Sequence, residues 1–404
     1  MARQLADDTV LRRARNLRLR IDSDEIVYVL KHGGVISCGR RGLAILDAFS
    51  VPTPLGEALD RIGGASTQDE WMDITSSIIG LHGAGVLLTE EEDETTRAVA
   101  DGTFADPMVH AMMLNDRRRT STFIDAVHDV VQPGDIVVDI GTGTGVLAVA
   151  AARAGAGHVY AIEASGTAQT ARRVFAVNAL ADRITLVEGW STDLELAQLG
   201  DVLVSEIIGE MPLEERVLET TLDARHRLLK PDAHLIPQRL RIVGEPISIP
   251  SEHLSGRIVQ ASTIGRWQSW YGIDLSPVAD ASHGLGHMIY IDREAAAALP
   301  VLGPSVVLAD IDLGAFETLQ VESETTVQMQ SAGLLNGVLI SFEVDLGNDR
   351  MVSSRPEFTD ERSSWRNVAW FFNESIDIEA GDRTAIEFTY RAPGRRNGVR
   401  IRRE

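Results

Sequence analysis

Two stretches of this chain carry residues whose types and spacing could do chemistry. The first runs from Asp135 to Ser165. It begins with a mostly apolar segment that includes Asp139 and ends at Ile140, and a glycine-rich turn and Glu163 follow. The turn contains three spaced glycines, Gly141, Gly143 and Gly145. Glu163 lies 22 residues after Gly141, close to the offset of about 20 residues at which an acid meets ribose hydroxyl groups in nucleotide-binding folds. This stretch predicts a site for a nucleoside-containing ligand.

The second stretch runs from Ser205 to Glu215 and has acids at Glu206, Glu210 and Glu215. It follows a predicted buried strand, and carboxylates at the C-terminal end of a parallel strand point into the ligand crevice of an α/β sheet. Paired carboxylates there could hold a cationic nitrogen, and one of them could accept a proton from a primary amine. The alternative is a helix start, because the helix macrodipole favours acids in the first turn.

Both stretches belong to an alternation of strands and helices. Asp135–Ile140 and His158–Ala164 are predicted strands, and Val146–Ala154 between them is a predicted helix of small residues. In such a βαβ unit the glycines let the backbone approach a ligand, and the helix N-terminus offers free amides. Further helices and strands are predicted at Ala168–Leu180, Arg183–Glu188, Asp201–Ile207, Leu213–Lys230 and His234–Pro237. The fold class is therefore α/β, with a Rossmann-like sheet.

Residues 1–92 are predicted to form a separate small α+β domain. Strands are expected at Glu25–Lys31, Gly34–Cys38 and Gly83–Thr89, and helices at Arg41–Ser50, Pro54–Ile62 and Thr67–Leu81. This order is typical of a winged-helix-like module and resembles the PqqD-like peptide-recognition domains of enzymes that tailor ribosomally made peptides. The resemblance implies that the leader of a precursor peptide adds as a strand to the sheet edge. A DNA-binding winged helix and a dimerisation module are the alternatives, but Trp71–Leu81 contains no Lys or Arg.

From Arg239 onward, alternating segments replace the helical period. Antiparallel strands are predicted at Arg239–Val243, Val306–Ile311, Gly337–Val344 and Thr384–Tyr390. We therefore expect three domains: the small domain at 1–92, the Rossmann-like domain at 93–237, and an antiparallel β-barrel domain at 238–404. The acidic run Glu90–Glu94 is expected to be a solvated linker at the first boundary.

The composition of the 404-residue chain limits the function classes. Its net charge of −21 argues against a nucleic-acid-coating surface and suits a cationic or amine substrate, although acidity also serves solubility alone. Cys38 is the single cysteine, so no intrachain disulfide is possible, and the ten histidines show no metal-ligand spacing. We find no signal peptide and no membrane-spanning apolar run, and we expect a cytoplasmic protein with no metal, nucleic-acid or membrane partner.

The glycine turn resembles that of class I S-adenosylmethionine (SAM) methyltransferases. Asp139 gives the pattern D-x-G-x-G-x-G, whereas a dinucleotide site prefers glycine or alanine where this chain has Val146. The resemblance implies that Asp139, the three turn glycines and Glu163 bind SAM as the cofactor. An NAD site and a purely structural turn are the alternatives.

Residues on either side of this unit resemble protein arginine methyltransferases, over about residues 104–393. Phe104–Val127 is predicted to be helical and carries the family pattern H-x-x-M-L-x-D-x-x-R-T. The resemblance implies that Arg119 meets the methionine carboxylate of SAM and Met113 its sulfur. The cofactor-binding positions that it implies in addition to the turn are His110, Met113, Arg119, Ser191 and Thr192. A solvated charge cluster at Arg117–Arg119 is the alternative.

The substrate side of the family pattern is also present. Glu206 and Glu215 match a double-Glu loop that grips the substrate guanidinium in the family, which implies that both are catalytic. Ser364 and Trp365 stand at the family's T-H-W loop, and with the extra acid Glu210 they are expected to line the substrate pocket. Ser364 replaces a histidine that shapes the guanidinium pocket in the family. A tryptophan beside a strand would otherwise belong to the core.

These features predict SN2 methyl transfer from SAM to a nitrogen. We expect the substrate to be a ribosomally made precursor peptide bound by residues 1–92, with a terminal primary amine, dimethylated as in daptide-type peptides, as the acceptor. An arginine guanidinium of a peptide or protein is the alternative acceptor. The family resemblance implies a homodimer with its arm within Ile249–Tyr271. A non-catalytic SAM-binding scaffold and a DNA-binding regulator are the alternatives from other classes.

Overall fold

In the computed structural model the described residues form two compact units, one up to Ala105 and the other comprising nearly all residues from Asp106 onward. The structure describes residues 6–14, 17–21, 27–31, 34–39, 41–62, 68–83, 85–89, 104, 106–254, 258–259, 261–282, 286–391 and 398–403. The predicted linker at Glu90–Glu94, and with it the first domain boundary, lies outside the described residues.

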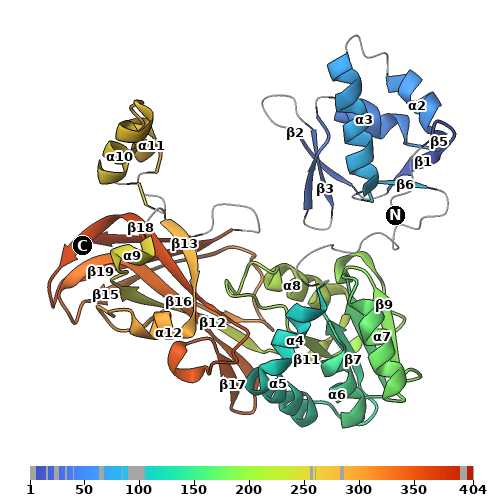
Figure 1. Ribbon diagram of the computed structural model, residues 1–404. Helices are drawn as coiled ribbons and strands as arrows, with labels where there is room; N and C mark the ends of the chain where they lie inside the picture. Colours follow the sequence, from blue (N-terminus) through green and yellow to red (C-terminus); the bar gives the residue numbers. More distant parts are fainter. Residues whose placement is uncertain are drawn as a thin grey trace. The chain divides into compact units, whose positions relative to one another are not determined.

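The first unit combines helices with two small antiparallel sheets (Figure 1). One sheet has the order β2 (Arg18–Ile21), β3 (Val27–Lys31), β4 (Gly34–Ser37). The other has the order β5 (Thr53–Pro54), β1 (Val10–Arg13), β6 (Leu87–Thr89), and the helices are α1 (Gly42–Ala48), α2 (Leu55–Ile62) and α3 (Gln68–Gly83). Leu11, Ile45, Phe49 and Leu81 are fully buried in its core.

The predicted hairpin and all three predicted helices of this unit are present. Among the described residues of this unit, the returning strand β6 pairs with β1, not with the hairpin as a simple winged helix would require. Sequence analysis did not anticipate β1, because its arginines Arg12 and Arg13 obscure the apolar alternation. The description of this unit as a winged-helix-like, PqqD-like module therefore stays a prediction.

The second unit begins with a five-stranded sheet of the order β11-β10-β7-β8-β9. Its strands are β7 (Ile136–Ile140), β8 (His158–Glu163), β9 (Ile184–Glu188), β10 (Gly200–Ser205) and β11 (Leu229–Ile236), and the ladders from β11 through β10 and β7 to β8 are parallel. The connecting helices include α6 (Val146–Ala154) and α7 (Ala168–Val177). The predicted α/β fold with a Rossmann-like parallel sheet is thereby confirmed.

Three helix predictions in this unit were wrong in their extent. The helix expected over Ala168–Leu180 ends at Val177. The single helix expected over Phe104–Val127 is two helices, α4 (Pro107–Asn115) and α5 (Arg117–Val130), because Asp116 ends the first and its carboxylate caps the second. The helix expected over Leu213–Lys230 is α8 (Val217–Arg227), since residues before it form a turn. Lys230 belongs to β11, where Pro231 is tolerated at an irregularity of an edge strand.

The C-terminal part is built of antiparallel strands, as predicted. One sheet has the order β13-β18-β16-β12-β14, with β17 paired to β16, and the other the order β15-β19-β20. The strands are β12 (Arg239–Ile247), β13 (Gly286–Ile291), β14 (Val306–Asp312), β15 (Val321–Gln328), β16 (Gly333–Gly347), β17 (Arg350–Ser353), β18 (Asn367–Ile378), β19 (Arg383–Tyr390) and β20 (Gly398–Arg403). Closure of these sheets into a barrel stays a prediction.

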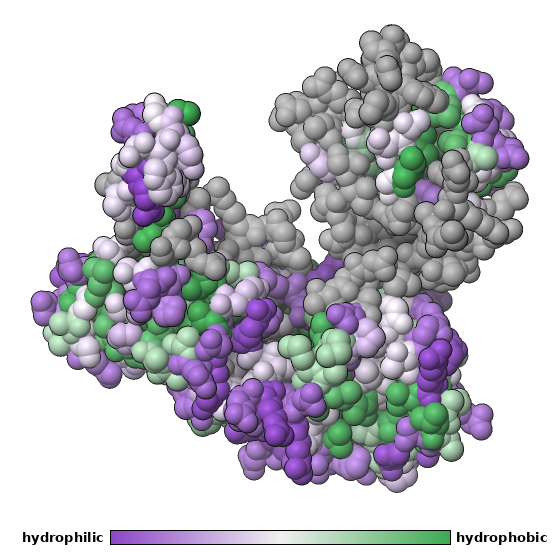
Figure 2. Space-filling model, viewed as in Figure 1, coloured by the Kyte–Doolittle hydropathy of each residue, from purple (hydrophilic) through white to green (hydrophobic). Residues whose placement is uncertain are grey.

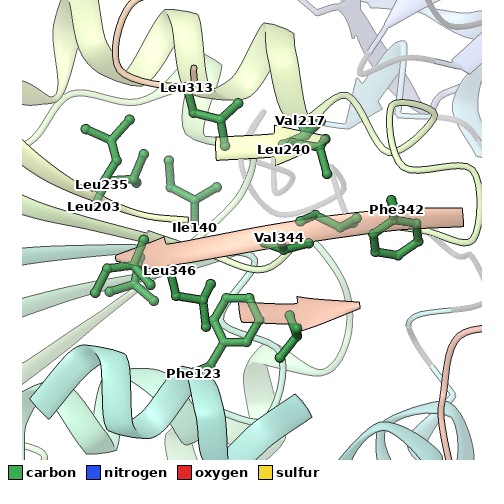
Figure 3. Packing of buried hydrophobic residues seen from close by; sticks show 14 of the residues in the cluster. Phe123, Ile140, Leu203, Val217, Leu235, Leu240, Leu313, Phe342, Val344 and Leu346 are labelled. Atoms are coloured by element: carbon green, nitrogen blue, oxygen red, sulfur yellow. The ribbon is translucent and has the colours of Figure 1, made fainter. Parts of the chain in front are cut away.

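The long strand β16 joins the two parts of the second unit through one hydrophobic core. Figure 3 shows Phe342, Val344 and Leu346 along this strand, with Phe123 of α5 and Ile140 of β7 packed around them. All five side chains are at most 5% exposed. The parallel sheet and the antiparallel strands therefore bury their apolar faces against each other.

Short helices connect β12 to β13 and β13 to β14: α9 (Ser251–Leu254), α10 (Ala261–Tyr271), α11 (Ser276–Ser282) and α12 (Arg293–Ala298). On the face drawn in Figure 2, the second unit mixes purple, hydrophilic residues with smaller green areas, as expected for a charge-rich chain whose apolar residues fill a core. Among the described residues, no helix is both long and apolar enough to cross a bilayer.

Candidate active site

The glycine turn after β7 is closely packed from several sides. Gly143 and Gly145 have φ of +53° and +85°, which side chains rarely adopt. A Cβ atom at Gly145 would lie 2.3 Å from Phe175 of α7, and one at Gly143 would lie 3.1 Å from the His110 ring of α4. Glycine is therefore needed at both positions.

Two buried acids stand at this turn. Glu163, at the end of β8, accepts a hydrogen bond of 2.8 Å from the Gly143 amide. Asp139, at 1% exposure, accepts one of 2.6 Å from the Thr142 hydroxyl. Burial raises the pKa of Asp139 to about 7, and the nearby Glu163 carboxylate adds to that rise. The predicted offset between the turn and Glu163 thus brings them into direct contact.

Helix α4 packs against the glycine turn through His110. The His110 ring is buried, and its Nε2 lies 3.0 Å from the Thr167 hydroxyl at the start of α7. Ser191 and Thr192 follow the next strand, β9, in a short 3-10 helix where Ser191 is buried and Thr192 is exposed. The predicted cofactor residues of β7, β8 and α4 are in mutual contact, whereas the structure gives Thr192 no contact with them.

Arg119 of α5 is the centre of the second group of predicted residues. Its guanidinium forms an ion pair with Glu206 and donates a hydrogen bond of 3.1 Å to the Ser364 hydroxyl. It also lies 3.7 Å from the Met113 sulfur and 5.1 Å from the centroid of the Trp365 ring. Burial lowers the pKa of Arg119 to about 10, so the side chain remains a cation at neutral pH.

Asp116 fixes this arginine through Ser364. The Asp116 carboxylate caps α5 by accepting from the Arg119 amide at 3.1 Å, and it also accepts from the amide and hydroxyl of Ser364, at 2.9 and 3.2 Å. The Ser364 hydroxyl can therefore donate to Asp116 while it accepts from the guanidinium. The serine that replaces the family histidine is thus an integral member of the site.

Trp365 is both a core residue and a site residue. Its indole nitrogen donates a hydrogen bond of 2.8 Å to the Ile208 carbonyl in the loop after β10. Its ring packs edge to face on Phe342, at 4.8 Å between centroids. Trp365 therefore belongs to the core, while its indole nitrogen contacts the acidic loop and its ring face lies near the Arg119 guanidinium. Its place in a substrate pocket stays a prediction.

The acids of the loop after β10 differ in their surroundings. Glu206 holds Arg119, whereas Glu215 folds back over the loop, where a Cβ at Gly209 would lie 2.4 Å from its carboxylate oxygen. Burial raises the pKa of Glu215 to about 7, the Glu210 carboxylate contributes to the rise, and Arg119 opposes it. Glu214 is exposed overall, but partial burial of its carboxyl group, together with the nearby Glu210, raises its pKa as well.

Sequence analysis missed three members of this site. Asp116 was noted only as part of a motif, and no role was assigned to Arg366 or Tyr290. Arg366 donates a hydrogen bond of 3.0 Å to Glu210, and its guanidinium lies 4.5 Å from the centroid of the Tyr290 ring. No local signal marks Tyr290, which meets the loop only through the pairing of β13 with β18.

The residues present fit SAM. Glu163 stands at the turn, where a carboxylate would accept ribose hydroxyls, and Arg119 offers a buried guanidinium fork to a carboxylate. His110, Phe175 and Ile207 pack against the turn glycines, so the backbone there is open to close approach only where these side chains leave space. Parallel sheet, glycine turn and acid together define a SAM-dependent methyltransferase.

Comparisons with known proteins agree with this class. The family described as ribosomal protein L11 methyltransferase (PrmA) matches residues 117–237. Protein arginine N-methyltransferase 1 of Schizosaccharomyces pombe is 30% identical over 281 residues, which cover 68% of this chain and 79% of that protein. Probable protein arginine N-methyltransferase 6.1 of Oryza sativa subsp. indica is 34% identical over 308 residues, 67% and 78% of the two chains. The chain belongs to the protein arginine methyltransferase family.

Other relatives match this chain over a smaller share of its length and of their own. Probable protein arginine N-methyltransferase 6 of Arabidopsis thaliana is 36% identical over 176 residues, 43% of this chain and 39% of that protein. This chain spans about a third of the length of two further Arabidopsis relatives.

Solved structures show the same fold at lower sequence identity. The PRMT1 enzyme–prozyme heterotetrameric complex of Trypanosoma brucei with AdoHcy has a TM-score of 0.63 at 23% identity, covering 75% of this chain and 95% of that one. Protein arginine methyltransferase 10 of Arabidopsis thaliana has a TM-score of 0.58 at 21% identity, covering 74% and 98%.

Proposed function

We propose that the protein transfers methyl groups from SAM to the guanidinium of an arginine in a peptide or protein. One observation carries this proposal. The chain's own Arg119 guanidinium is ion-paired with Glu206, and the Glu215 carboxylate opposes the lowering of the Arg119 pKa by burial, so both acids act on one guanidinium group. Carboxylates so placed would hold a substrate guanidinium in the same way.

The residues of the loop would bind and orient the acceptor nitrogen. SAM, when bound, supplies a methyl group on a positively charged sulfur. A bond forms between that carbon and the nitrogen, the carbon–sulfur bond breaks with its electrons staying on sulfur, and the nitrogen loses one proton. Because arginine remains protonated near neutral pH, Glu206 and Glu215 would bind and orient the guanidinium more than remove a proton from it.

Cofactor binding is assigned to residues at the glycine turn, at the end of β8 and on α5. We propose Glu163 for the ribose, Arg119 for the methionine carboxylate and the glycine turn for the intervening atoms. Asp139 supports the turn through Thr142. Ser191 and Thr192 remain proposed contacts of the adenine at the end of β9.

A terminal amine of a precursor peptide is the second candidate acceptor. Two observations favour it: Ser364 stands where the family has histidine, and the Glu215 pKa of about 7 suits a carboxylate that accepts a proton from an ammonium group. The family relatives named as arginine methyltransferases support the guanidinium more strongly.

For residues 1–92 we propose a peptide-recognition role. β2 is an edge strand of its sheet, and its Leu19 and Ile21 are 45% and 54% exposed. An extended peptide could add to such an edge and cover these side chains. The absence of Lys and Arg from α3 argues against DNA recognition by that helix.

We also propose a homodimer that uses helices α10 and α11. Trp270 and Tyr271 at the end of α10 are 62% and 61% exposed, and Ile273 beyond them is 56% exposed. Large exposed apolar and aromatic side chains of this kind are typical of interfaces. Sedimentation of the wild type and of Trp270→Ser tests this proposal, with the variant expected to be monomeric.

The function is tested by titrating S-adenosylhomocysteine (AdoHcy) into the full-length protein and then mapping methylation by mass spectrometry. The substrates are an arginine-containing peptide and the same peptide with lysine in place of arginine. We expect AdoHcy binding and a mass gain of one or more methyl groups on the arginine side chain. Methylation confined to the terminal amine would replace the first candidate by the second, and AdoHcy binding without methylation of either peptide would favour a scaffold.

A further inference from the structure

Arg366 is placed beside the acidic loop by the antiparallel sheet. It directly precedes β18, whose Val368 pairs with Tyr290 of β13, so the two side chains meet at the end of this ladder. The Arg366 Nε donates to Glu210 at 3.0 Å, and the guanidinium carbon lies 4.5 Å from the Tyr290 ring centroid. A carboxylate and an aromatic face thus hold one guanidinium, as a binding site for a foreign cation would.

The charges around the loop are distributed unevenly. Glu206 is neutralised by Arg119 and Glu210 by Arg366. Among the residues that the structure describes, Glu214 and Glu215 form no ion pair with a basic side chain. The Glu215 carboxylate thus has no ion-pair partner and stays available for the acceptor, whereas the Glu210 carboxylate already holds a cation.

We propose that Arg366 is a specificity-determining residue that occupies, with its own guanidinium, the position where a second cation of the substrate would bind. This inference rests on the proposed arginine methylation. With Arg366 in place, a positively charged substrate residue next to the acceptor arginine gains no binding free energy from Glu210 and Tyr290. Without Arg366, the carboxylate and the ring face become free to bind such a residue.

The test uses two peptides that differ in one side chain next to the acceptor arginine: lysine in one, the neutral norleucine in the other. KM and kcat are measured by mass spectrometry for the wild type and for Arg366→Ala, whose side chain is 57% exposed in the wild type and not needed for the core. In the wild type the two KM values should be similar. In Arg366→Ala, the KM of the lysine peptide should fall by about three- to tenfold relative to the norleucine peptide, the range expected of one exposed ion pair with a cation–π contact.

Two further variants separate the proposed contact from a general charge effect. Arg362→Ala removes another exposed positive charge of the same segment and should leave the KM ratio near that of the wild type. Arg366→Ala combined with Glu210→Gln should lose the preference for lysine. An unchanged ratio in Arg366→Ala, or the same shift in Arg362→Ala, would overturn the proposal.

The inference and the proposed function can fail separately. If neither peptide is methylated by the wild type, arginine methylation is wrong for these peptides. The same two peptides are then titrated calorimetrically into the AdoHcy-bound wild type and Arg366→Ala proteins. A lysine preference that appears only in the variant would still support the role of Arg366, and equal affinities in both proteins would refute it.

Discussion

The Arg119 guanidinium and the Glu206 carboxylate form an ion pair in which the two side chains are only 9% and 12% exposed. The expected cofactor ligand and an expected catalytic acid are therefore neutralised by each other. Breaking a pair so far removed from water is costly, because the remaining charge loses its partner. The proposed cofactor and substrate sites thus share one ion pair, and we expect a substitution in one of them to affect binding in the other.

Glu206→Gln should abolish most of the methyl transfer. It removes one of the two charges that orient the acceptor, and we expect kcat/KM to fall by about 100-fold or more, as for loss of a preorganised polar group. AdoHcy affinity, measured by calorimetry, should stay the same or increase, since Arg119 is then free for the ligand carboxylate. Retained activity together with weakened AdoHcy binding would contradict the assignment.

Arg119→Lys should weaken cofactor binding although it keeps the charge. A lysine cannot reach Ser364, Glu206 and a ligand carboxylate at once with a planar fork. We expect the AdoHcy dissociation constant to rise by about 10- to 100-fold, the value of one charged hydrogen bond. Arg117→Lys, at an exposed position two residues earlier, is the matched control and should bind AdoHcy like the wild type.

The activity should rise with pH up to about 7. Burial and Glu210 raise the pKa of Glu215 from its ordinary 4.5 to about 7, and the ionised form is needed to hold a guanidinium. A plot of kcat/KM against pH for an arginine peptide should therefore show an ascending limb near 7. That limb should be absent from the residual activity of Glu215→Gln and present in Glu252→Gln, a control at an exposed acid of α9.

The same raised pKa affects stability in the opposite direction. Between about pH 4.5 and 7 the folded protein keeps a proton on Glu215 that the unfolded chain has released, so this group lowers the free energy of unfolding as pH rises. Urea unfolding at pH 5 and pH 8 should show that Glu215→Gln loses less stability over this interval than the wild type. An equal loss in both proteins would argue against a raised pKa.

Gly145→Ala should impair both folding and cofactor binding. The new Cβ would lie 2.3 Å from the Phe175 ring, at a residue with φ of +85°. We expect a cost of about 1–3 kcal/mol in stability and a loss of AdoHcy affinity, measured by denaturant unfolding and calorimetry. Gly265→Ala in α10, where no atom lies within 4 Å of the new Cβ, should be neutral or stabilising by up to about 1 kcal/mol.

The βαβ unit could be predicted from sequence because its signals are local. Helix α6 begins and ends at the predicted residues Val146 and Ala154, since glycines flank a run of small apolar residues. The break at Asp116 was missed because the polar residues Asn115–Thr122 are compatible with the solvent face of one helix. Only the capping contacts show that Asp116 ends one helix and starts the next.

The candidate site was predictable to the extent that its residues follow neighbouring strands. Glu163 and Glu206 come directly after β8 and β10, and topology alone brings strand ends to one edge of a sheet. The contact between Arg119 and Ser364 spans 245 residues, so only a family resemblance could relate them. The Arg366–Tyr290 contact could be predicted neither from strand topology nor from the family resemblance, because it depends on the register of β13 with β18.

The core shared along β16 has a consequence for how this protein can change over evolutionary time. Phe342, Val344 and Leu346 fill space beside Phe123 and Ile140, so each half supplies part of the other's interior. A recombination event at residue 237 would leave two unmatched apolar surfaces unless the incoming strand restored the same side-chain volumes. The methyl-transfer half and the antiparallel half should therefore be inherited as a single piece.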